Sequence, residues 1–410
     1  MKSNDIFSQS SPIYLQLYER LKSDIISGVY KTGERFPSKR VIGDRYAVSL
    51  VTVEHALQLL MDEGYIVSRQ RSGCRVIYSE RSFYGGTQGT WSMSMTDARS
   101  SSVLPAAQPA SSKQAPSDLT ADLPLTDAQS RPCPDLSGSS SHGSFSPGLE
   151  LFPFSAYART MRRVIQDYGE QLLERVPGCG VLKLREAICS YLARSRGIRV
   201  TPEHVVIGAG SEYLYSLIVQ LFGRDCIFGI EAPSYIKIEK VYRSNGAQLE
   251  MLTLGPDGIT SDSLAASQAD ILHISPYRSY PSGISTTASK RREYIRWADM
   301  HGAYIVEDDF ESEFTTSSKP EETVYSLSDR DNVLYLNSFT RTISPSTRIS
   351  YLILPGQLLG AYSERLGYLA CTVPAFDQYV LAEFIESGEF ERHINRVRRR
   401  LRDIAQADRA

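Results

Sequence analysis

The chain has 410 residues, of which 41% are hydrophobic and 22% are charged. This composition is typical of soluble globular proteins and excludes wholesale disorder, and the length is enough for two or three domains. The formal net charge of −2 excludes a uniformly basic molecule, so any nucleic-acid binding must come from a local basic surface.

The cysteines and the apolar segments narrow the class of protein further. The six cysteines include no CxxC pair and no nearby histidine pair, which argues against structural zinc and against a disulfide framework. The first residues, MKSNDIFSQSSPIYLQ, contain no apolar signal-peptide core, and no stretch approaches the length of a membrane span. We therefore expect a cytoplasmic protein with no metal and no membrane partner.

Residues 10–80 have the pattern of a small helical domain that ends in a hairpin. IYLQLYERLKSDIISG spaces apolar residues such as Leu17 at helical intervals and ends at Gly28. Two helices follow, KRVIGDRY and LVTVEHALQLLMDEG, and the residues before them, Ser38 and Ser49, are good N-caps. The β-rich pieces YIVS and CRVIY then flank a basic tip, RQRSG.

This order of elements predicts a winged helix-turn-helix that binds double-stranded operator DNA. In that motif one helix enters the major groove and the wing follows the phosphates. Arg40, Arg69 and Arg71 fall at the expected contact points. The alternative is a small helical scaffold domain whose arginines are only solvated.

The same segment resembles the GntR family of bacterial regulators, whose pattern is approximately LPSxRxLAxxLGVSRxTVxxAxxxLxxEGxL followed by a glycine-containing wing. The match is carried by Pro37, Ser38, Arg40, Val48, Ser49, Thr52, Val53, Ala56, Leu60, Glu63 and Gly64. We expect DNA contacts from Ser38, Arg40, Ser49, Thr52, Arg69, Arg71 and Gly73. Leu50 replaces the arginine that usually follows Ser49, so one common DNA contact is missing, and specificity is expected to rest on Arg40 and the wing.

The rest of the chain divides into a linker and a large α/β unit. Residues 81–130 are rich in Ser, Ala, Pro and Gly, which predicts a flexible linker because little surface can be buried there. In residues 131–410, apolar runs such as AYIVEDDF and NVLYLNSF alternate with helix-like stretches. This alternation predicts a mostly parallel sheet covered on both faces, with a ligand site at the carboxyl ends of its strands.

A GntR-type reader, a linker and this α/β unit together resemble the MocR subfamily of regulators, whose large domain has the fold-type I aminotransferase fold. The resemblance is carried by EDDFESEF, SPYRSYPSG and SFTRTISPSTRISYLILP. It implies a pyridoxal phosphate site: a helix start for the phosphate, an aromatic on the ring, an aspartate on the ring nitrogen, and further phosphate ligands. The corresponding residues are Gly210, Ser211, Glu212, Tyr235, Asp308, Ser338 and Arg348, with Arg341 at the cofactor-lysine position.

Each of these residues also has a plainer interpretation. The glycine-rich turn at Gly210 is also an ordinary strand-to-helix connection, and Tyr235 is also a core residue. Asp308 is also a solvated strand end, and Arg348 is also half of a surface salt bridge. Weak single motifs of this kind gain weight only in combination.

Several positions depart from the family, and Arg341 is the most important of them. The resemblance implies a lysine there that holds the cofactor as a Schiff base, and a guanidinium stays protonated and cannot do so. The remaining lysines of the large unit, 183, 237, 240, 290 and 319, lie outside the motif. Phe310 and Arg278 replace a tyrosine and a histidine, and Arg175 replaces a second tyrosine. The family continues into a small C-terminal domain, which we expect to be missing here.

We therefore expect a dimeric transcription regulator without catalytic activity. Its large domain either binds pyridoxal phosphate or another small anionic effector noncovalently, or serves as a ligand-free dimerisation scaffold. An enzyme or sensor that uses another lysine is a further alternative. Anion binding is favoured because clustered arginines are costly unless paired, although Asp308 facing Arg341 would supply such a pair without a ligand.

Overall fold

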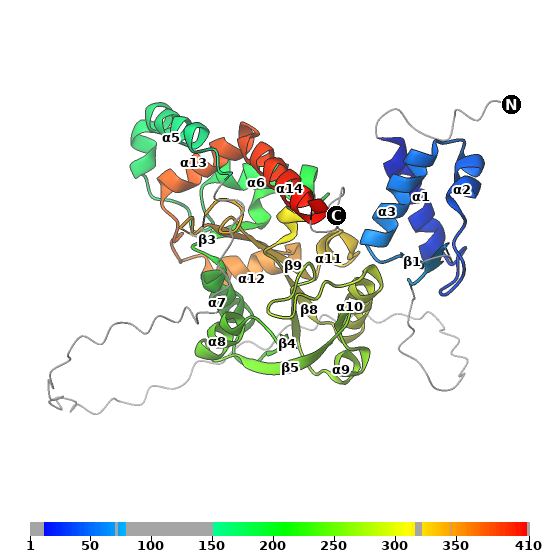
Figure 1. The fold of residues 1–410 in the computed structure, drawn as a ribbon. Helices are drawn as coiled ribbons and strands as arrows, with labels where there is room; N and C mark the ends of the chain where they lie inside the picture. The colour runs from blue at the N-terminus through cyan, green and yellow to red at the C-terminus, as the bar shows by residue number, and fades with distance from the viewer. Residues whose placement is uncertain (1–11, 70–72, 79–150, 316–321, 345, 408–410) are drawn as a thin grey trace, which may run out of the picture. The chain divides into compact units, whose positions relative to one another are not determined.

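The structure is a computed structural model with a small N-terminal part and a large α/β part (Figure 1). The described residues are 12–69, 73–78, 151–315, 322–344 and 346–407. The linker predicted for 81–130, the first part of the large unit predicted from residue 131, and the tip of the wing lie outside these residues.

The N-terminal part contains the elements of a winged helix-turn-helix in the predicted order. Its three helices and two antiparallel strands are α1 (Ile13–Ile26), α2 (Lys39–Tyr46), α3 (Leu50–Asp62), β1 (Ile66–Arg69) and β2 (Gly73–Val76). One apolar core joins them, and its fully buried members include Leu17, Leu21, Val53, Ala56 and Leu60. The winged-helix prediction is confirmed for the described residues.

Local hydrogen bonds explain where α2 and α3 begin. The Ser38 hydroxyl accepts from the Val41 amide at 3.4 Å, and the Ser49 hydroxyl accepts from the Thr52 amide at 3.1 Å. Each bond satisfies an amide that the helix itself leaves without a partner. Between the two helices, Ala47 takes a left-handed conformation with φ of 52°, which turns the chain sharply.

The large part is built on one eight-stranded sheet with the order β3-β10-β9-β8-β7-β4-β5-β6. The strands are β3 (Val205–Gly208), β4 (Ile227–Ala232), β5 (Gln248–Gly255), β6 (Gly258–Ile259), β7 (Ile271–Ile274), β8 (Tyr304–Asp309), β9 (Val333–Ser338) and β10 (Ser350–Ile353). The pairs β5–β4, β4–β7, β7–β8 and β8–β9 are parallel, whereas β10 is antiparallel to both of its neighbours. A mostly parallel sheet was predicted, and it is present.

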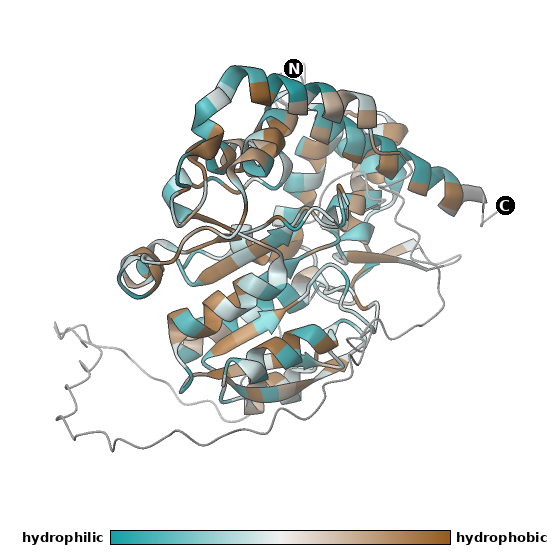
Figure 2. Cartoon of the chain, turned by 90° about the vertical axis from the view of Figure 1, so that its left-hand side faces the viewer, coloured by the Kyte–Doolittle hydropathy of each residue, from teal (hydrophilic) through white to brown (hydrophobic). Residues whose placement is uncertain are grey.

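Helices cover both faces of this sheet, as Figure 2 shows by the brown strands between layers of partly teal helices. The helices are α5 (Phe154–Tyr168), α6 (Leu182–Ser195), α7 (Ser211–Phe222), α8 (Ile236–Ser244), α9 (Ser261–Ala266), α10 (Ala288–His301), α11 (Val324–Leu327), α12 (Gly356–Leu366), α13 (Ala375–Glu386) and α14 (Glu389–Ala407). Adjacent residues of one strand belong to different cores: Ile305 packs in the core with α9 and α10, and Val306 in the core with α7 and α8. This alternation is the physical reason that the strands read as continuous apolar runs.

Helix α14 buries Ile394 and Val397 and exposes most of its arginines, as an amphipathic helix should. Arg398 differs, because its guanidinium is partly buried and donates to the Glu313 carbonyl at 2.5 Å. Along the described part of the chain, no helix combines the length and apolar character that a membrane crossing requires.

Candidate functional site

The predicted DNA contacts gather at the starts of α2 and α3. Arg40 is exposed in the first turn of α2, directly after the cap Ser38. Ser49 and Thr52 lie together at the start of α3, with 2.8 Å between their hydroxyl oxygens. Both serines therefore serve as helix caps at the positions where DNA contacts were predicted.

The predicted wing is described only in part. Gly73 begins β2 with φ of 79°, a left-handed value that suits glycine. The side chain of Arg69 and the whole of Arg71 lie outside the described residues, so their predicted DNA contacts remain predictions.

Helix α3 also presents exposed residues that sequence reasoning did not select. Leu50 and Val51 follow the cap Ser49 and are 51% and 62% exposed. Glu54, one turn later, forms an ion pair with Lys39 of α2 at 2.5 Å. The signal in the sequence was the replacement of an arginine by Leu50, but the exposure of its side chain needed the fold.

In the large part, the predicted phosphate cradle lies between β3 and α7. Gly210 has φ of 89°, and a Cβ at this position would collide with the guanidinium of Arg348. Ser211 and Glu212 begin α7, as predicted. The close approach of Arg348 to the helix start therefore depends on glycine at position 210.

A carboxylate of the chain itself binds the side chains around the predicted phosphate site. The Glu212 carboxylate accepts from Arg348 Nη2 at 2.5 Å and from Lys237 Nζ at 3.0 Å. Burial alone would raise the pKa of Glu212, but the hydrogen bonds from Lys237, from its own backbone amide and from Arg348 outweigh it and lower the pKa. Glu212 is thus a carboxylate bound where a phosphate was predicted.

Asp308, predicted to pair with the ring nitrogen of a cofactor, lies buried near the carboxyl end of β8. Its Oδ2 accepts from the Tyr215 hydroxyl at 2.5 Å and lies 3.5 Å from His273 Nε2. His273 Nδ1 in turn lies 2.7 Å from the Tyr242 hydroxyl. Asp308 Oδ1 is buried without a hydrogen-bond partner among the described residues, so one acceptor remains for a donor from outside the chain.

Arg341 does not pair with Asp308, and that expectation is wrong. Arg341 instead forms an ion pair with Glu311, and Arg278 Nη1 approaches the same carboxylate at 3.3 Å. The reason is that Asp308 is buried and held by Tyr215, whereas Arg341 is half exposed in the turn after β9. The arginines at 278 and 341 are therefore paired without a ligand, which removes the cost that favoured anion binding.

The two remaining predicted cofactor residues have local partners. The Ser338 hydroxyl donates to Thr340 Oγ1 at 2.9 Å and accepts from the Ser350 hydroxyl at 2.8 Å. Tyr235 packs edge-on against Tyr280, with ring centroids 5.7 Å apart. Both residues are present at the carboxyl edge of the sheet, and their predicted cofactor contacts remain predictions.

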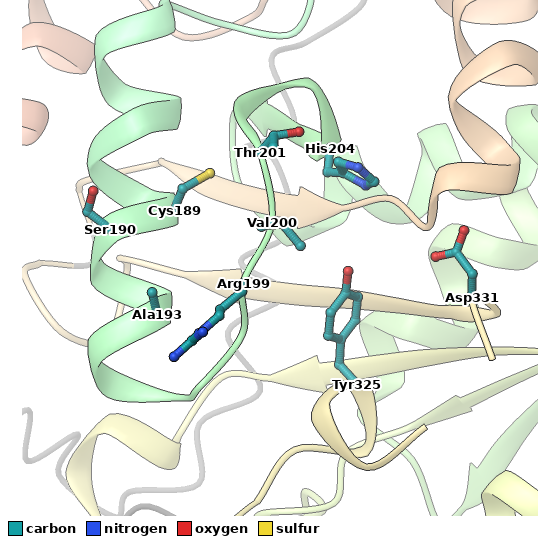
Figure 3. A pocket seen from close by; sticks show the side chains of 9 residues that line it. All are labelled: Cys189, Ser190, Ala193, Arg199, Val200, Thr201, His204, Tyr325 and Asp331. Atoms are coloured by element: carbon teal, nitrogen blue, oxygen red, sulfur yellow. The ribbon is translucent and has the colours of Figure 1, made fainter. Parts of the chain in front are cut away.

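Several hollows occur in the large part, and two of them bear on the question of a functional site. The one beside Arg348 has a volume of about 340 Å³, and Ala209, Thr372 and Asp377 also line it. The other, of about 620 Å³, lies between α6, residues 199–204 and the segment from Tyr325 to Asp331 (Figure 3). Only the hollow at Arg348 adjoins the predicted site.

The hollow of Figure 3, which sequence reasoning missed, is lined by Cys189, His204 and Asp331 among others. Burial raises the pKa of the Cys189 thiol to about 11, so it is not a thiolate at neutral pH. Asp331 accepts from the Gln357 amide at 3.0 Å, and His204 Nδ1 lies 2.7 Å from the Leu354 carbonyl. No group of three or more side chains that could hold a metal ion occurs among the described residues.

Comparisons with known proteins agree with this division of the chain. Residues 13–76 match the family described as bacterial regulatory proteins, gntR family, and residues 153–406 match aminotransferase class I and II. The uncharacterized HTH-type transcriptional regulator YdeL of Bacillus subtilis is 30% identical over 95% of this chain and 76% of its own length. The probable rhizopine catabolism regulatory protein MocR of Rhizobium meliloti is 28% identical over 95% of this chain and 74% of its own.

Among solved structures, the large part is similar to aminotransferases. LysN, the alpha-aminoadipate aminotransferase from Thermus thermophilus, is 27% identical with a TM-score of 0.57, over 63% of this chain and 68% of its own. The kynurenine aminotransferase of Pyrococcus horikoshii is 22% identical with a TM-score of 0.55, over 62% of this chain and 65% of its own. The second likeness concerns the fold alone, and this chain spans less than two thirds of that enzyme.

Proposed function

We propose that this chain is a dimeric regulator whose large domain holds a small anion noncovalently. The proposal starts from the family: the chain belongs to the GntR-type transcriptional regulators that carry an aminotransferase class I and II domain. The winged helix binds operator DNA, and the large domain senses the effector without performing transamination. The observation that carries the sensing role is the buried, unpartnered Oδ1 of Asp308.

Loss of catalysis is inferred from the chemistry at position 341. A guanidinium does not lose its proton near neutral pH and is no nucleophile toward an aldehyde. Arg341 is also held by Glu311. Among the other lysines, Lys183, Lys237 and Lys290 each bind a carboxylate. At Lys183 burial lowers the pKa but hydrogen bonds to Glu386, Tyr168 and Glu383 outweigh it, and at Lys237 the hydrogen bond to Glu212 raises the pKa, so both amines are held protonated.

The residues present fit noncovalent binding of pyridoxal phosphate at the ring and less well at the phosphate. When bound in aminotransferases, this cofactor supplies an electron sink through its protonated ring nitrogen. Here Asp308 Oδ1 would accept from the ring nitrogen, and the amides of Ser211 and Glu212 with the Arg348 guanidinium would hold the phosphate. The Glu212 carboxylate competes for the same guanidinium.

The ligand-free scaffold remains the second candidate function, because a specific observation favours it. Arg278 and Arg341 are satisfied by Glu311, and Arg348 is satisfied by Glu212. If the large domain is a scaffold, the pocket needs no effector, and the domain acts only through the apolar surfaces that form the dimer. Titration with the anion separates the two candidates, since the scaffold predicts no saturable binding.

Dimerisation is inferred from large exposed apolar side chains of the large domain. Leu173 and Tyr368 are 88% and 73% exposed. Their segments are neighbours, because a Cβ on Gly178 would collide with the Leu369 carbonyl. Apolar side chains grouped at a surface mark an interface with another protein, here a second copy of the chain. Light scattering should give twice the chain mass of 45.7 kDa, and a monomer at micromolar concentration would contradict the dimer.

Binding of an effector can regulate the dimer only if one of its arrangements binds the effector more tightly. The DNA-binding role is tested with the full chain and a labelled duplex from the region upstream of its own gene. Arg40→Ala should weaken binding by roughly tenfold, the loss of one charge-assisted contact. Fluorescence anisotropy measures the effect, and an unchanged affinity and specificity would refute the role of Arg40.

A further inference from the structure

The recognition helix α3 has no positive charge of its own. Residues 50–62, LVTVEHALQLLMD, include no lysine and no arginine. Its inner side is buried in the core of the domain through Val53, Ala56, Leu57, Leu59 and Leu60. Any base-reading contact from this helix must therefore come from uncharged or acidic side chains.

The first turn of α3 carries two adjacent apolar side chains on its outer surface. Leu50 is 51% exposed and Val51 is 62% exposed, immediately after the cap Ser49. The hydroxyl of Ser49 accepts from the amide of Thr52 and thereby fixes the start of the helix at these two residues. In helix-turn-helix proteins, residues at this end of the recognition helix contact base edges in the major groove.

The only acidic side chain in the first two turns of α3 is Glu54, and an ion pair offsets its charge. Glu54 pairs with Lys39 at 2.5 Å, with both side chains more than half exposed. The same pair engages Lys39, the lysine of α2. The strongest contact to guanine is a bidentate arginine or lysine, and the start of α3 offers neither.

The one apolar group that a base pair presents in the major groove is the C5-methyl group of thymine. Leu50 and Val51 match it in polarity, and a contact with the methyl group would remove apolar surface of both partners from water. We propose that Leu50 and Val51 read thymine methyl groups, so that each half-site carries A·T pairs where the start of α3 enters the groove. The proposal rests on the proposed DNA-binding function, with Arg40 and the wing supplying phosphate contacts.

The test removes the methyl group and nothing else. Selection from a random duplex library with the full chain gives the preferred half-site, and each of its thymines is then replaced by deoxyuridine. At one or two positions of each half-site, loss of the methyl should weaken binding about fourfold, the equivalent of one buried methylene group. Anisotropy titrations at one fixed salt concentration measure the ratio.

Variants connect the methyl effect to the helix. Leu50→Ala and Val51→Ala should each weaken binding to the thymine duplex and abolish the thymine–uracil difference at one position. Val29→Ala is the matched control, because Val29 is also 62% exposed but lies after α1, outside α3. The control should keep the full difference, and far-ultraviolet circular dichroism should give the same helix content for all four proteins.

The outcomes separate this inference from the function it rests on. Equal binding of thymine and uracil duplexes by the unaltered chain would overturn methyl reading while leaving DNA binding intact. A thymine–uracil difference that survives both alanine variants would overturn the assignment to Leu50 and Val51. Failure to bind any duplex would overturn the proposed DNA-binding function itself.

Discussion

At the scale of single residues, two glutamates hold the arginines of the site, and pattern reasoning could not predict these ion pairs. Glu311 holds Arg278 and Arg341, and Glu212 holds Arg348. The sequence shows Arg341 where the family resemblance predicts a lysine. Its partner is not visible, because an ion pair between separate loops depends on how the strand ends meet.

Glu212→Gln should increase the affinity for pyridoxal phosphate. The substitution keeps the size of the side chain and removes a negative charge that competes with the phosphate for Arg348 and Lys237. One charge a few ångströms from a dianion corresponds to about tenfold in the dissociation constant. Isothermal titration calorimetry measures it, and inorganic phosphate serves as a second probe.

Glu239→Gln is the control for this substitution, since Glu239 pairs with Arg243 within α8. An affinity that is unchanged or lower in Glu212→Gln would show that the carboxylate does not compete with the phosphate. In that case Glu212 positions Arg348 for the anion instead.

At the scale of helices and strands, most of the fold could be predicted because the signals are local. Ser38 and Ser49 cap the helices that they were expected to cap. Strand β5 (Gln248–Gly255) was missed, because its residues are mostly exposed or half-buried near the edge of the sheet and give no continuous apolar run. The position of β10 between β3 and β9 could not be predicted, since the sequence of a strand does not indicate which distant strand it pairs with.

The carboxyl end of β4 carries a buried acid that makes stability depend on pH. Glu231 is 4% exposed, and burial raises the pKa of its carboxyl to about 7 from an ordinary value of 4.5. Between these values the folded protein keeps a proton that the unfolded chain has lost, so the free energy of unfolding decreases as pH rises. The loss from this group is up to about 3 kcal/mol and is complete above pH 7.

Glu231→Gln cannot ionise and should therefore lose less stability between pH 5 and 8 than the unaltered protein. Its amide donates where a carboxylate accepted from Ser279 and Ser275, which adds an offset that does not change with pH. Urea denaturation at several pH values measures the slopes. Glu364→Gln, at an exposed position of α12, is the control, and parallel slopes for Glu231→Gln and the unaltered protein would refute this origin of the pH dependence.

At the scale of the whole molecule, the chain joins a GntR-type helix-turn-helix domain to an aminotransferase class I and II domain. The family matches assign the N-terminal part to the gntR family and the large part to aminotransferase class I and II. Asp308 Oδ1 is buried without a hydrogen-bond partner among the described residues, and Arg341, which we propose stands at the position of the cofactor lysine, pairs with Glu311. These features together favour noncovalent binding of pyridoxal phosphate.

The most direct test of this account is an absorbance titration of the full chain with pyridoxal phosphate, followed by borohydride reduction and peptide mass analysis. Arg341→Lys is treated in parallel as the matched variant. The account predicts saturable binding without a lysine adduct in the unaltered protein, and an adduct at position 341 in the variant. A covalent adduct on any lysine of the unaltered protein would contradict it.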